Sequence, residues 1–353
     1  MNKKSKILLI TVVSIFGVLL LAALIVPFPI VNSAYDSNFA KHFTTYEGFA
    51  LSLDDFDGLN REKYTFPSNN GQILTGYKYF HQNTELKGLV VFAHGFGGGG
   101  HNGYMNVINY FTKNGYQVFA YDATANDESE GDVVGGLPQG IVDLDYALRF
   151  VKSEKDFSNL PIFLWGHSWG GYSVGSVTKL HSDVKGVIVV SGFNSSADMF
   201  ESEGRNIAGS AIKFIMPFYN IIDRKKYGDY APMSIVDSLS ESKVPAMFLH
   251  SKDDSTIPFE DSFEIYYENF GNDSNYLFET YENRGHNYVV NSDIAREYRN
   301  QYEAEYSEYR KNQENMTYEM KVAYDKANFD KKTANHLDED LMAKMIKFCD
   351  ENR

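Results

Sequence analysis

A serine flanked by glycines gives the clearest chemical signal in the sequence. Ser168 lies in the segment Gly166-His167-Ser168-Trp169-Gly170, between an apolar run and a helix-like stretch. A nucleophile on a sharp strand-to-helix turn needs small residues two positions before and after it, because the strained backbone leaves no room for a Cβ there. The helix that follows also directs the Trp169 amide toward developing negative charge. The segment therefore predicts Ser168 as a nucleophile rather than as part of a purely structural turn.

A nucleophilic serine needs a base and an acid, and candidates follow in the chain order serine, acid, histidine. The strand-like run Ala246–His250 leads into a loop that carries two carboxylates, Asp253 and Asp254, and the next strand leads to Gly285-His286. Taken alone, the carboxylates are compatible with a helix cap and the histidine with a surface loop. Together they predict a Ser-acid-His triad in which either carboxylate serves as the acid.

A glycine-rich loop is the fourth element of the predicted site. The segment His94-Gly95-Phe96 is followed by glycines at 97–100, at the end of an apolar strand. Such a loop lets a backbone amide approach the substrate oxygen, and Phe96 is the predicted donor of this second oxyanion contact. Phosphate binding is the alternative, but no Lys-Ser or Lys-Thr pair follows the glycines. We therefore expect no nucleotide.

The elements around these residues alternate between strand-like and helix-like segments, which is typical of a doubly wound α/β domain with helices on both faces. Several strands are continuous apolar runs, which indicates a mostly parallel sheet. The first two strands are joined by Ser68-Asn69-Asn70-Gly71, a turn that predicts an antiparallel hairpin. The eight predicted strands are 63–66, 73–81, 88–94, 117–121, 161–166, 186–191, 246–250 and 276–281, and helices are expected at 103–114, 139–152, 169–181 and 260–270.

Two segments interrupt this alternation. Residues 195–240 are too long for a bare connection and predict a helical cap. Residues 293–330 place tyrosines and methionines at three- and four-residue intervals among charges, which predicts a helical insertion whose aromatic stripe packs on the domain or on a neighbouring helix. In the apolar part of the cap, Phe214 and Phe218 are predicted either to line an acyl pocket or to seat the cap on the domain.

Composition narrows the class of protein. With 353 residues, 43% of them hydrophobic and 23% charged, the chain has the composition of an ordinary folded protein. The 33 basic and 47 acidic residues give a net charge of −14, the wrong sign for binding nucleic acid. The single cysteine, Cys349, excludes an internal disulfide and a multi-cysteine zinc site.

The N-terminal part of the chain predicts a membrane anchor. Residues 7–26 form an uncharged run, long enough to cross a bilayer as one helix, and residues 1–6 carry three lysines. Lysines before such a run favour a cytoplasmic N-terminus, which places the rest of the chain outside the cell membrane. Residues 27–60 are then a polar tether to a catalytic domain over 61–353, with a few aromatic residues that are able to dock onto the domain.

Signal cleavage is the alternative to an anchor. Small residues precede a possible cut near Ser33 or Ala34, and cleavage there would give a secreted protein. The uncharged run is longer than the apolar core of most signal peptides, which favours the retained helix.

Four motifs together resemble the α/β-hydrolase superfamily: strand-HGFGGGG, strand-GHSWGG, HSKDDSTIP and RGHN. Within it, the pattern is similar to serine aminopeptidase-like and monoacylglycerol-lipase-like hydrolases. The resemblance covers roughly residues 62–287 and a final helix near 337–349. Relatives often carry Asp-x-Arg-Gly-x-Gly-x-Ser after the fourth strand, a pattern that residues 122–131 do not match. The insertion at 293–330 is a second departure, and it is expected to reshape the mouth of the pocket.

The resemblance implies an eight-stranded hydrolase fold and a site that uses neither metal nor cofactor. It also decides between the two carboxylates, because the family's acid usually stands three residues before a β-branched residue and a proline, here Ile257-Pro258. The implied roles are nucleophile for Ser168, general base for His286, orienting acid for Asp254, and oxyanion hole for the amides of Phe96 and Trp169.

The expected function is a membrane-anchored serine hydrolase that cleaves carboxylic esters, acylglycerols first among them, through an acyl-enzyme. A serine aminopeptidase that acts on short peptides is an alternative, in which Glu201 or Glu203 of the cap would bind the ammonium group of the substrate. Acyl transfer and thioester hydrolysis would use the same triad. A non-catalytic binding protein with this fold is the last alternative, and the complete triad argues against it.

Overall fold

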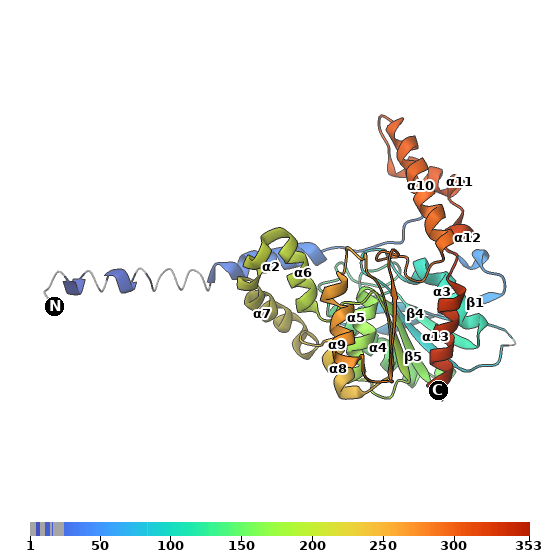
Figure 1. Ribbon diagram of the computed structural model, residues 1–353, viewed down its shortest axis with the longest axis horizontal. Helices are drawn as coiled ribbons and strands as arrows, with labels where there is room; N and C mark the ends of the chain where they lie inside the picture. The colour runs from blue at the N-terminus through green and yellow to red at the C-terminus, as the bar shows by residue number, and fades with distance from the viewer. Residues whose placement is uncertain (1–4, 8–10, 15, 17–24, 83) are drawn as a thin grey trace.

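A twisted eight-stranded sheet forms the centre of the molecule (Figure 1). The structure is a computed structural model that describes residues 5–7, 11–14, 16, 25–82 and 84–353. The strands are β1 Leu59–Pro67, β2 Ile73–His81, β3 Gly88–Ala93, β4 Tyr116–Tyr121, β5 Ile162–His167, β6 Gly186–Val190, β7 Ala246–Ser251 and β8 Tyr276–Tyr281. All eight predicted strands are therefore confirmed.

The strands lie in the order β1-β2-β4-β3-β5-β6-β7-β8. The β1–β2 and β2–β4 pairs are antiparallel, and the pairs from β4 to β8 are parallel. The predicted turn at 68–71 joins β1 to β2, and Gly71 adopts a φ of 82° there, which glycine accepts without strain. The sheet is thus mostly parallel, with an antiparallel hairpin at one edge, as the sequence predicted.

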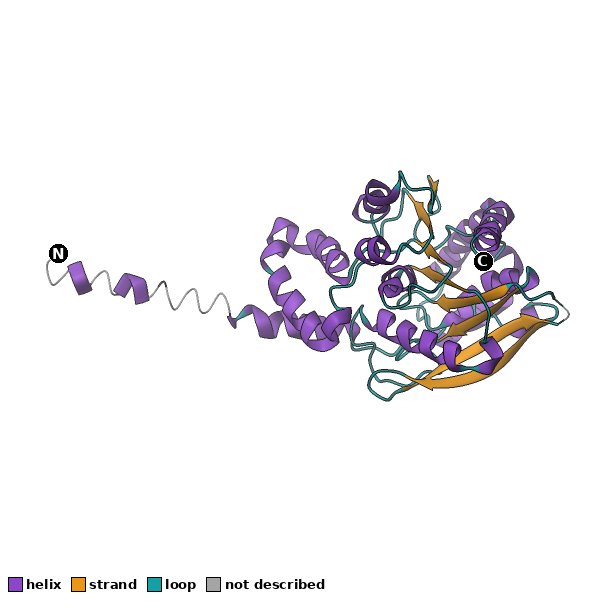
Figure 2. Ribbon diagram, turned by 90° about the horizontal axis from the view of Figure 1, so that it is seen from below, coloured by secondary structure: helices purple, strands orange, loops and turns teal. Residues whose placement is uncertain are grey.

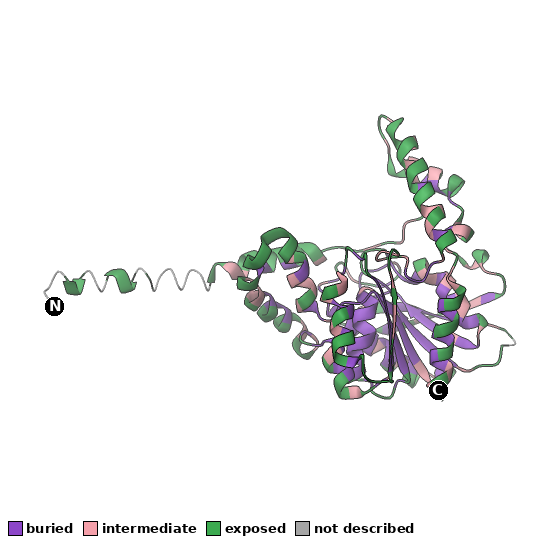
Figure 3. Cartoon of the chain, in the orientation of Figure 1, coloured by how far each residue is buried: buried purple, intermediate pink, exposed green. Residues whose placement is uncertain are grey.

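Helices cover both faces of the sheet (Figure 2). Successive residues of a strand point to opposite faces, so Val90 and Phe92 of β3 pack on one side while Leu89 and Val91 pack on the other. Every residue of β3 is buried, and the central strands form the core (Figure 3). One face is covered by α4 Gln139–Ser153, α5 Trp169–Ser176, α8 Ile235–Ser242 and α9 Phe263–Phe270, and the other by α3 Met105–Lys113 and α13 Glu339–Glu351.

The predicted cap is helical. Its two principal helices, α6 Ser196–Ala208 and α7 Met216–Tyr227, are joined by a 3-10 turn over Gly209–Phe214. Ser195 starts α6 by accepting a hydrogen bond from the Asp198 amide, the usual device for a helix N-terminus.

The region expected to be a tether, 27–60, differs from that expectation at its start. Residues Pro27–Phe39 form helix α2, which packs against α7 of the cap. Val31 and Tyr35 of α2 are buried against Tyr219 and Ile222 of the cap. The tether is therefore corrected to a docked helix over 27–39, because its aromatic and apolar side chains find a partner surface on the cap.

The predicted membrane anchor, 7–26, lies largely outside the described residues. Within the ranges that the structure does describe, no helix is both long enough and apolar enough to cross a bilayer. The anchor stays a prediction.

The late insertion consists of two helices that project from the domain, α10 Asp293–Lys311 and α11 Tyr318–Asn328 (Figure 1). The predicted aromatic stripe packs between them, with the rings of Tyr309 and Tyr324 stacked 4.1 Å apart. Buried Asp325 of α11 accepts hydrogen bonds from the hydroxyls of Tyr302 and Tyr46, which ties both helices to the segment before β1. The stripe therefore pairs with a neighbouring helix, as expected.

Candidate active site

Ser168 lies at the tight turn between β5 and α5. Its backbone has φ 57° and ψ −116°, in a region that residues with a side chain rarely adopt. A Cβ at Gly166 would collide with the carbonyl of Gly170, and a Cβ at Gly170 would collide with the carbonyl oxygen of Ala93. Both glycines are therefore required for the turn, as the sequence predicted.

Three loops at the carboxyl edge of the sheet bring Ser168, His286 and Asp254 together. The Oγ of Ser168 lies 2.9 Å from Nε2 of His286, and Nδ1 of His286 lies 2.8 Å from Oδ2 of Asp254. Asp254 follows β7 and His286 follows β8, and these strands are neighbours in the sheet. With a proton on Nδ1 donated to the carboxylate, Nε2 is free to accept the proton of the serine.

Asp254 is almost fully buried, at 4% exposure. Its second oxygen, Oδ1, accepts hydrogen bonds from the amides of Thr256 and Ile257 at 2.9 Å and 2.8 Å. Burial raises the pKa of this carboxyl, but hydrogen bonds from His250 and His286 outweigh burial and hold the pKa below its usual value. The group therefore stays ionised and fixed in place beside the imidazole.

Asp253 has a different set of partners. Its Oδ1 accepts hydrogen bonds from the hydroxyl of Ser251 and from the amide of Gly285, at 2.5 Å and 2.8 Å. Gly285 has a φ of 57° and immediately precedes His286. Asp253 thus holds the backbone of the histidine loop, whereas Asp254 is the carboxylate against the imidazole.

The amides predicted to form an oxyanion hole belong to Phe96 and Trp169. Both residues line the pocket that contains Ser168 and His286. In the part of the chain that the structure describes, neither amide has a hydrogen-bond partner. An unpaired amide beside the nucleophile is available to a developing negative charge on the substrate.

The pocket around Ser168 has a volume of about 670 Å³. Its apolar lining comes from several distant segments, which include Phe49 before β1, Leu137 before α4, Phe193 after β6 and Met199 of the cap. Arg299 of α10 also lines it, so the late insertion contributes to the pocket as expected.

The four cap residues predicted to bind substrate lie elsewhere. Phe214 is 81% exposed, and the ring of Phe218 packs edge-on against Phe28 of α2 at 5.0 Å. Neither these phenylalanines nor Glu201 and Glu203 are among the described residues that line the pocket with Ser168. For Phe218 the geometry favours the alternative of a structural role in packing the cap, since the side chain contacts Phe28 of α2.

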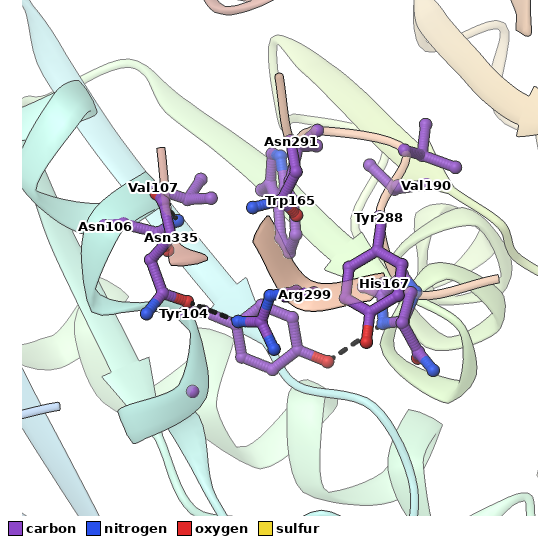
Figure 4. Close-up of a pocket in the computed structure, with 14 residues that line it drawn as sticks. Tyr104, Asn106, Val107, Trp165, His167, Val190, Tyr288, Asn291, Arg299 and Asn335 are labelled. Atoms are coloured by element: carbon purple, nitrogen blue, oxygen red, sulfur yellow. Dashed lines mark hydrogen bonds between the residues drawn. The ribbon is translucent and has the colours of Figure 1, made fainter. Parts of the chain in front are cut away.

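His167 and Tyr104 form a hydrogen-bonded link that the sequence did not predict (Figure 4). The Tyr104 hydroxyl accepts from the Gly95 amide at 3.1 Å and donates to Nδ1 of His167 at 2.9 Å. His167 in turn donates from Nε2 to the carbonyl oxygen of His286 at 2.9 Å.

The link between Gly95 and His286 depends on a neutral imidazole at His167. Burial and, to a smaller extent, the neighbouring His286 together lower the pKa of His167 to about 3. A neutral ring can accept at one nitrogen and donate at the other, so it connects the glycine-rich loop to the backbone of His286. The sequence signal for this role was weak, because Tyr104 and His167 are 63 residues apart.

Comparison with known proteins finds similarity to hydrolases over part of the chain. Residues 84–223 match the family described as serine aminopeptidase, S33. A monoglyceride lipase of Saccharomyces cerevisiae is 26% identical over 132 residues, and one of Rattus norvegicus is 28% identical over 145 residues. A caffeoylshikimate esterase of Arabidopsis thaliana is 28% identical over 116 residues. These matches cover 34%, 40% and 32% of this chain, and only 36%, 46% and 35% of the respective relatives.

Solved structures share the fold at low sequence identity. An esterase of Pyrococcus furiosus superposes with a TM-score of 0.52 at 16% identity, over 74% of this chain and 93% of that one. Est1E of Butyrivibrio proteoclasticus with bound ferulic acid superposes with a TM-score of 0.50 at 18% identity, over 75% and 96%. The fold is therefore shared with esterases over most of the described chain.

Proposed function

We propose that the chain is a serine hydrolase with the α/β-hydrolase fold, and that it cleaves carboxylic esters through a covalent acyl-enzyme. The observation that carries the proposal is the line of Ser168, His286 and Asp254, with both contacts within 2.9 Å. The nearby unpaired amides of Phe96 and Trp169 support the same chemistry.

The proposed reaction has two halves. Ser168 Oγ attacks the acyl carbon while His286 takes its proton at Nε2, and the amides of Phe96 and Trp169 hold the oxyanion. His286 returns the proton to the departing alkoxide, which leaves an ester between the acyl group and Ser168. Water then attacks this ester with His286 again as the base, and the acid product leaves. Asp254 keeps the imidazole in the correct tautomer throughout.

Acylglycerol-like esters are the proposed substrate class. The similarity to monoglyceride lipases supports this choice, and so does the apolar lining of the pocket by residues such as Leu137, Phe193 and Met199. Peptide substrates are the alternative that the family description suggests. An aminopeptidase needs a carboxylate to bind the substrate ammonium, and the described residues that line this pocket include none. Acyl transfer and thioester hydrolysis would use the same groups.

We also propose that residues 7–26 anchor the enzyme in the cell membrane with its catalytic domain outside. The uncharged run and the three lysines before it support this arrangement. An anchor of this kind would hold the pocket close to lipid esters.

Labelling with a fluorophosphonate tests the reaction class, because this reagent phosphonylates an activated serine. We expect the wild type to be labelled, and Ser168→Ala to lose both labelling and ester hydrolysis, with turnover lower by about 10⁴-fold or more. The melting temperature of the variant should be nearly unchanged, since only one oxygen is removed. A panel of glyceryl esters and aminoacyl anilides then separates esterase from peptidase activity. Undiminished hydrolysis by Ser168→Ala would disprove the proposal.

A further inference from the structure

We infer that Arg299 binds an anionic group of the substrate, so that the preferred esters carry a carboxylate or phosphate in addition to the bond that is cleaved. The inference rests on the proposed hydrolase function and narrows its substrate class. It is drawn from the charge of the pocket and from the contacts of one arginine of the late insertion.

Two hydrogen bonds hold the side chain of Arg299 in place. Its Nε donates to the carbonyl oxygen of Ala334 at 2.7 Å, and one terminal nitrogen donates to Oδ1 of Asn335 at 3.0 Å (Figure 4). The guanidinium also lies 5.1 Å from the centre of the Tyr288 ring. A guanidinium has five N–H donors. The anchoring bonds use two of them, and three remain for a ligand.

No carboxylate neutralises Arg299 within the described chain. The contrast within α10 is clear, because Arg296, one turn earlier, pairs with Asp293. Arg149, Arg205 and Arg284 likewise have carboxylate partners. In a protein of net charge −14, an arginine that is half-buried without a carboxylate beside it is unusual.

Arg299 lies where two cavities adjoin. It lines both the pocket of about 670 Å³ around Ser168 and a smaller adjoining cavity of about 80 Å³ beneath Tyr288 and His167. Among the described residues that line the two cavities, Arg299 is the one with a permanent charge. The cation therefore borders a partly open pocket whose lining is both polar and apolar, where a charge-assisted hydrogen bond to a carboxylate or phosphate is stronger than in open solvent.

Pairs of esters in which one member carries an additional anionic group test this inference. On the acyl side, 4-nitrophenyl hemisuccinate is compared with 4-nitrophenyl pentanoate. On the alcohol side, 1-butyrylglycerol 3-phosphate is compared with 1-butyrylglycerol. We expect Arg299→Met to lower kcat/KM by about tenfold or more for the anionic member of one pair, and by less than about threefold for the neutral members. The pair that responds shows which side of the ester carries the anion.

Two further variants separate binding from structure. Arg299→Lys keeps the charge and should retain part of the preference for the anionic ester. Arg310→Met removes a charge from an exposed position of the same helix and should change neither pair. Equal losses on neutral and anionic esters in Arg299→Met, with a lower melting temperature, would show that Arg299 only fastens Ala334 and Asn335, and would overturn the inference. Wild-type protein that hydrolyses no ester and takes up no fluorophosphonate would overturn the hydrolase function itself.

Discussion

At the scale of single residues, two adjacent carboxylates position different parts of the histidine loop. Asp254 contacts the imidazole and Asp253 contacts the backbone of the preceding glycine. The contact with the imidazole fixes the tautomer and stabilises the imidazolium that forms in the reaction, whereas the contact with the backbone fixes only the path of the loop. The two carboxylates should therefore differ in their effect on catalysis although both lie near His286.

We expect Asp254→Asn to lower kcat by about 10³–10⁴-fold, because an amide cannot stabilise the imidazolium and favours the wrong tautomer. Asp253→Asn keeps an oxygen acceptor for the Gly285 amide and should cost about tenfold or less. Steady-state kinetics on one neutral ester, with melting temperatures for both variants, provide the comparison. If Asp253→Asn were the more damaging change, the role of the acid would move to Asp253.

The motifs around Ser168 and His286 allowed the site to be predicted because each of them is local in sequence. A glycine two positions from Ser168, or a proline four positions after Asp254, is visible without the fold. The link from Tyr104 through His167 to His286 was not predictable in this way, since it joins three segments that are far apart in the sequence. Arg299 was likewise one cation among many in a charged helix until the fold brought it to the pocket.

At the scale of elements, helix α2 and the cap form one unit joined through a buried acid. The Tyr35 hydroxyl of α2 donates to Oδ1 of Asp223 in α7 at 2.6 Å. Apolar spacing in the cap is compatible with an acyl pocket, but it does not distinguish side chains that face substrate from side chains that face another helix. Phe218 faces Phe28 of α2, a helix whose own pattern was too weak for it to be predicted. The cap was therefore predicted as an element, but its contacts were not.

The pH dependence of the contact between α2 and the cap follows from Asp223. Burial raises its pKa to about 6, although hydrogen bonds from Tyr35 and Ser196 and the charge of Lys226 act in the opposite direction. Because this pKa is above that of an exposed carboxyl, the contribution of Asp223 to stability is fully present below about pH 4 and is lost as the pH rises through 6. Above pH 6 the buried charge depends on its hydrogen-bond donors.

We therefore expect Tyr35→Phe to lower the free energy of unfolding by about 1–3 kcal/mol at pH 8, where Asp223 is ionised and loses a donor, and by less at pH 5. Chemical denaturation at the two pH values measures the difference. Tyr267→Phe is the matched control, because Tyr267 is 58% exposed and its hydroxyl has no hydrogen-bond partner within the described chain. An effect of Tyr35→Phe that is equal at both pH values would contradict the role of the Asp223 charge.

At the scale of the whole molecule, the proposed anchor determines on which side of the membrane the domain over 61–353 lies. If residues 7–26 span the bilayer with the lysines inside, the domain over 61–353 is outside. Protease added to intact cells or spheroplasts should then digest the domain, while a cytoplasmic marker protein stays intact. Protection of the domain until the membrane is permeabilised would reverse the orientation. A mature N-terminus at Ala34 or Tyr35 would replace the anchor by a cleaved signal.

The only cysteine of the chain, Cys349, is fully buried in α13, and burial raises the pKa of its thiol. The folded protein therefore presents no reactive thiolate to a maleimide. Slow modification of Cys349 by a maleimide would report opening of helix α13, which covers the sheet. A chain whose one thiol is buried is convenient for site-directed labelling. A cysteine introduced at an exposed site such as Phe214 would be the sole point of attachment for a spin label or fluorophore, so movements of the cap during turnover could be followed without first removing a native thiol.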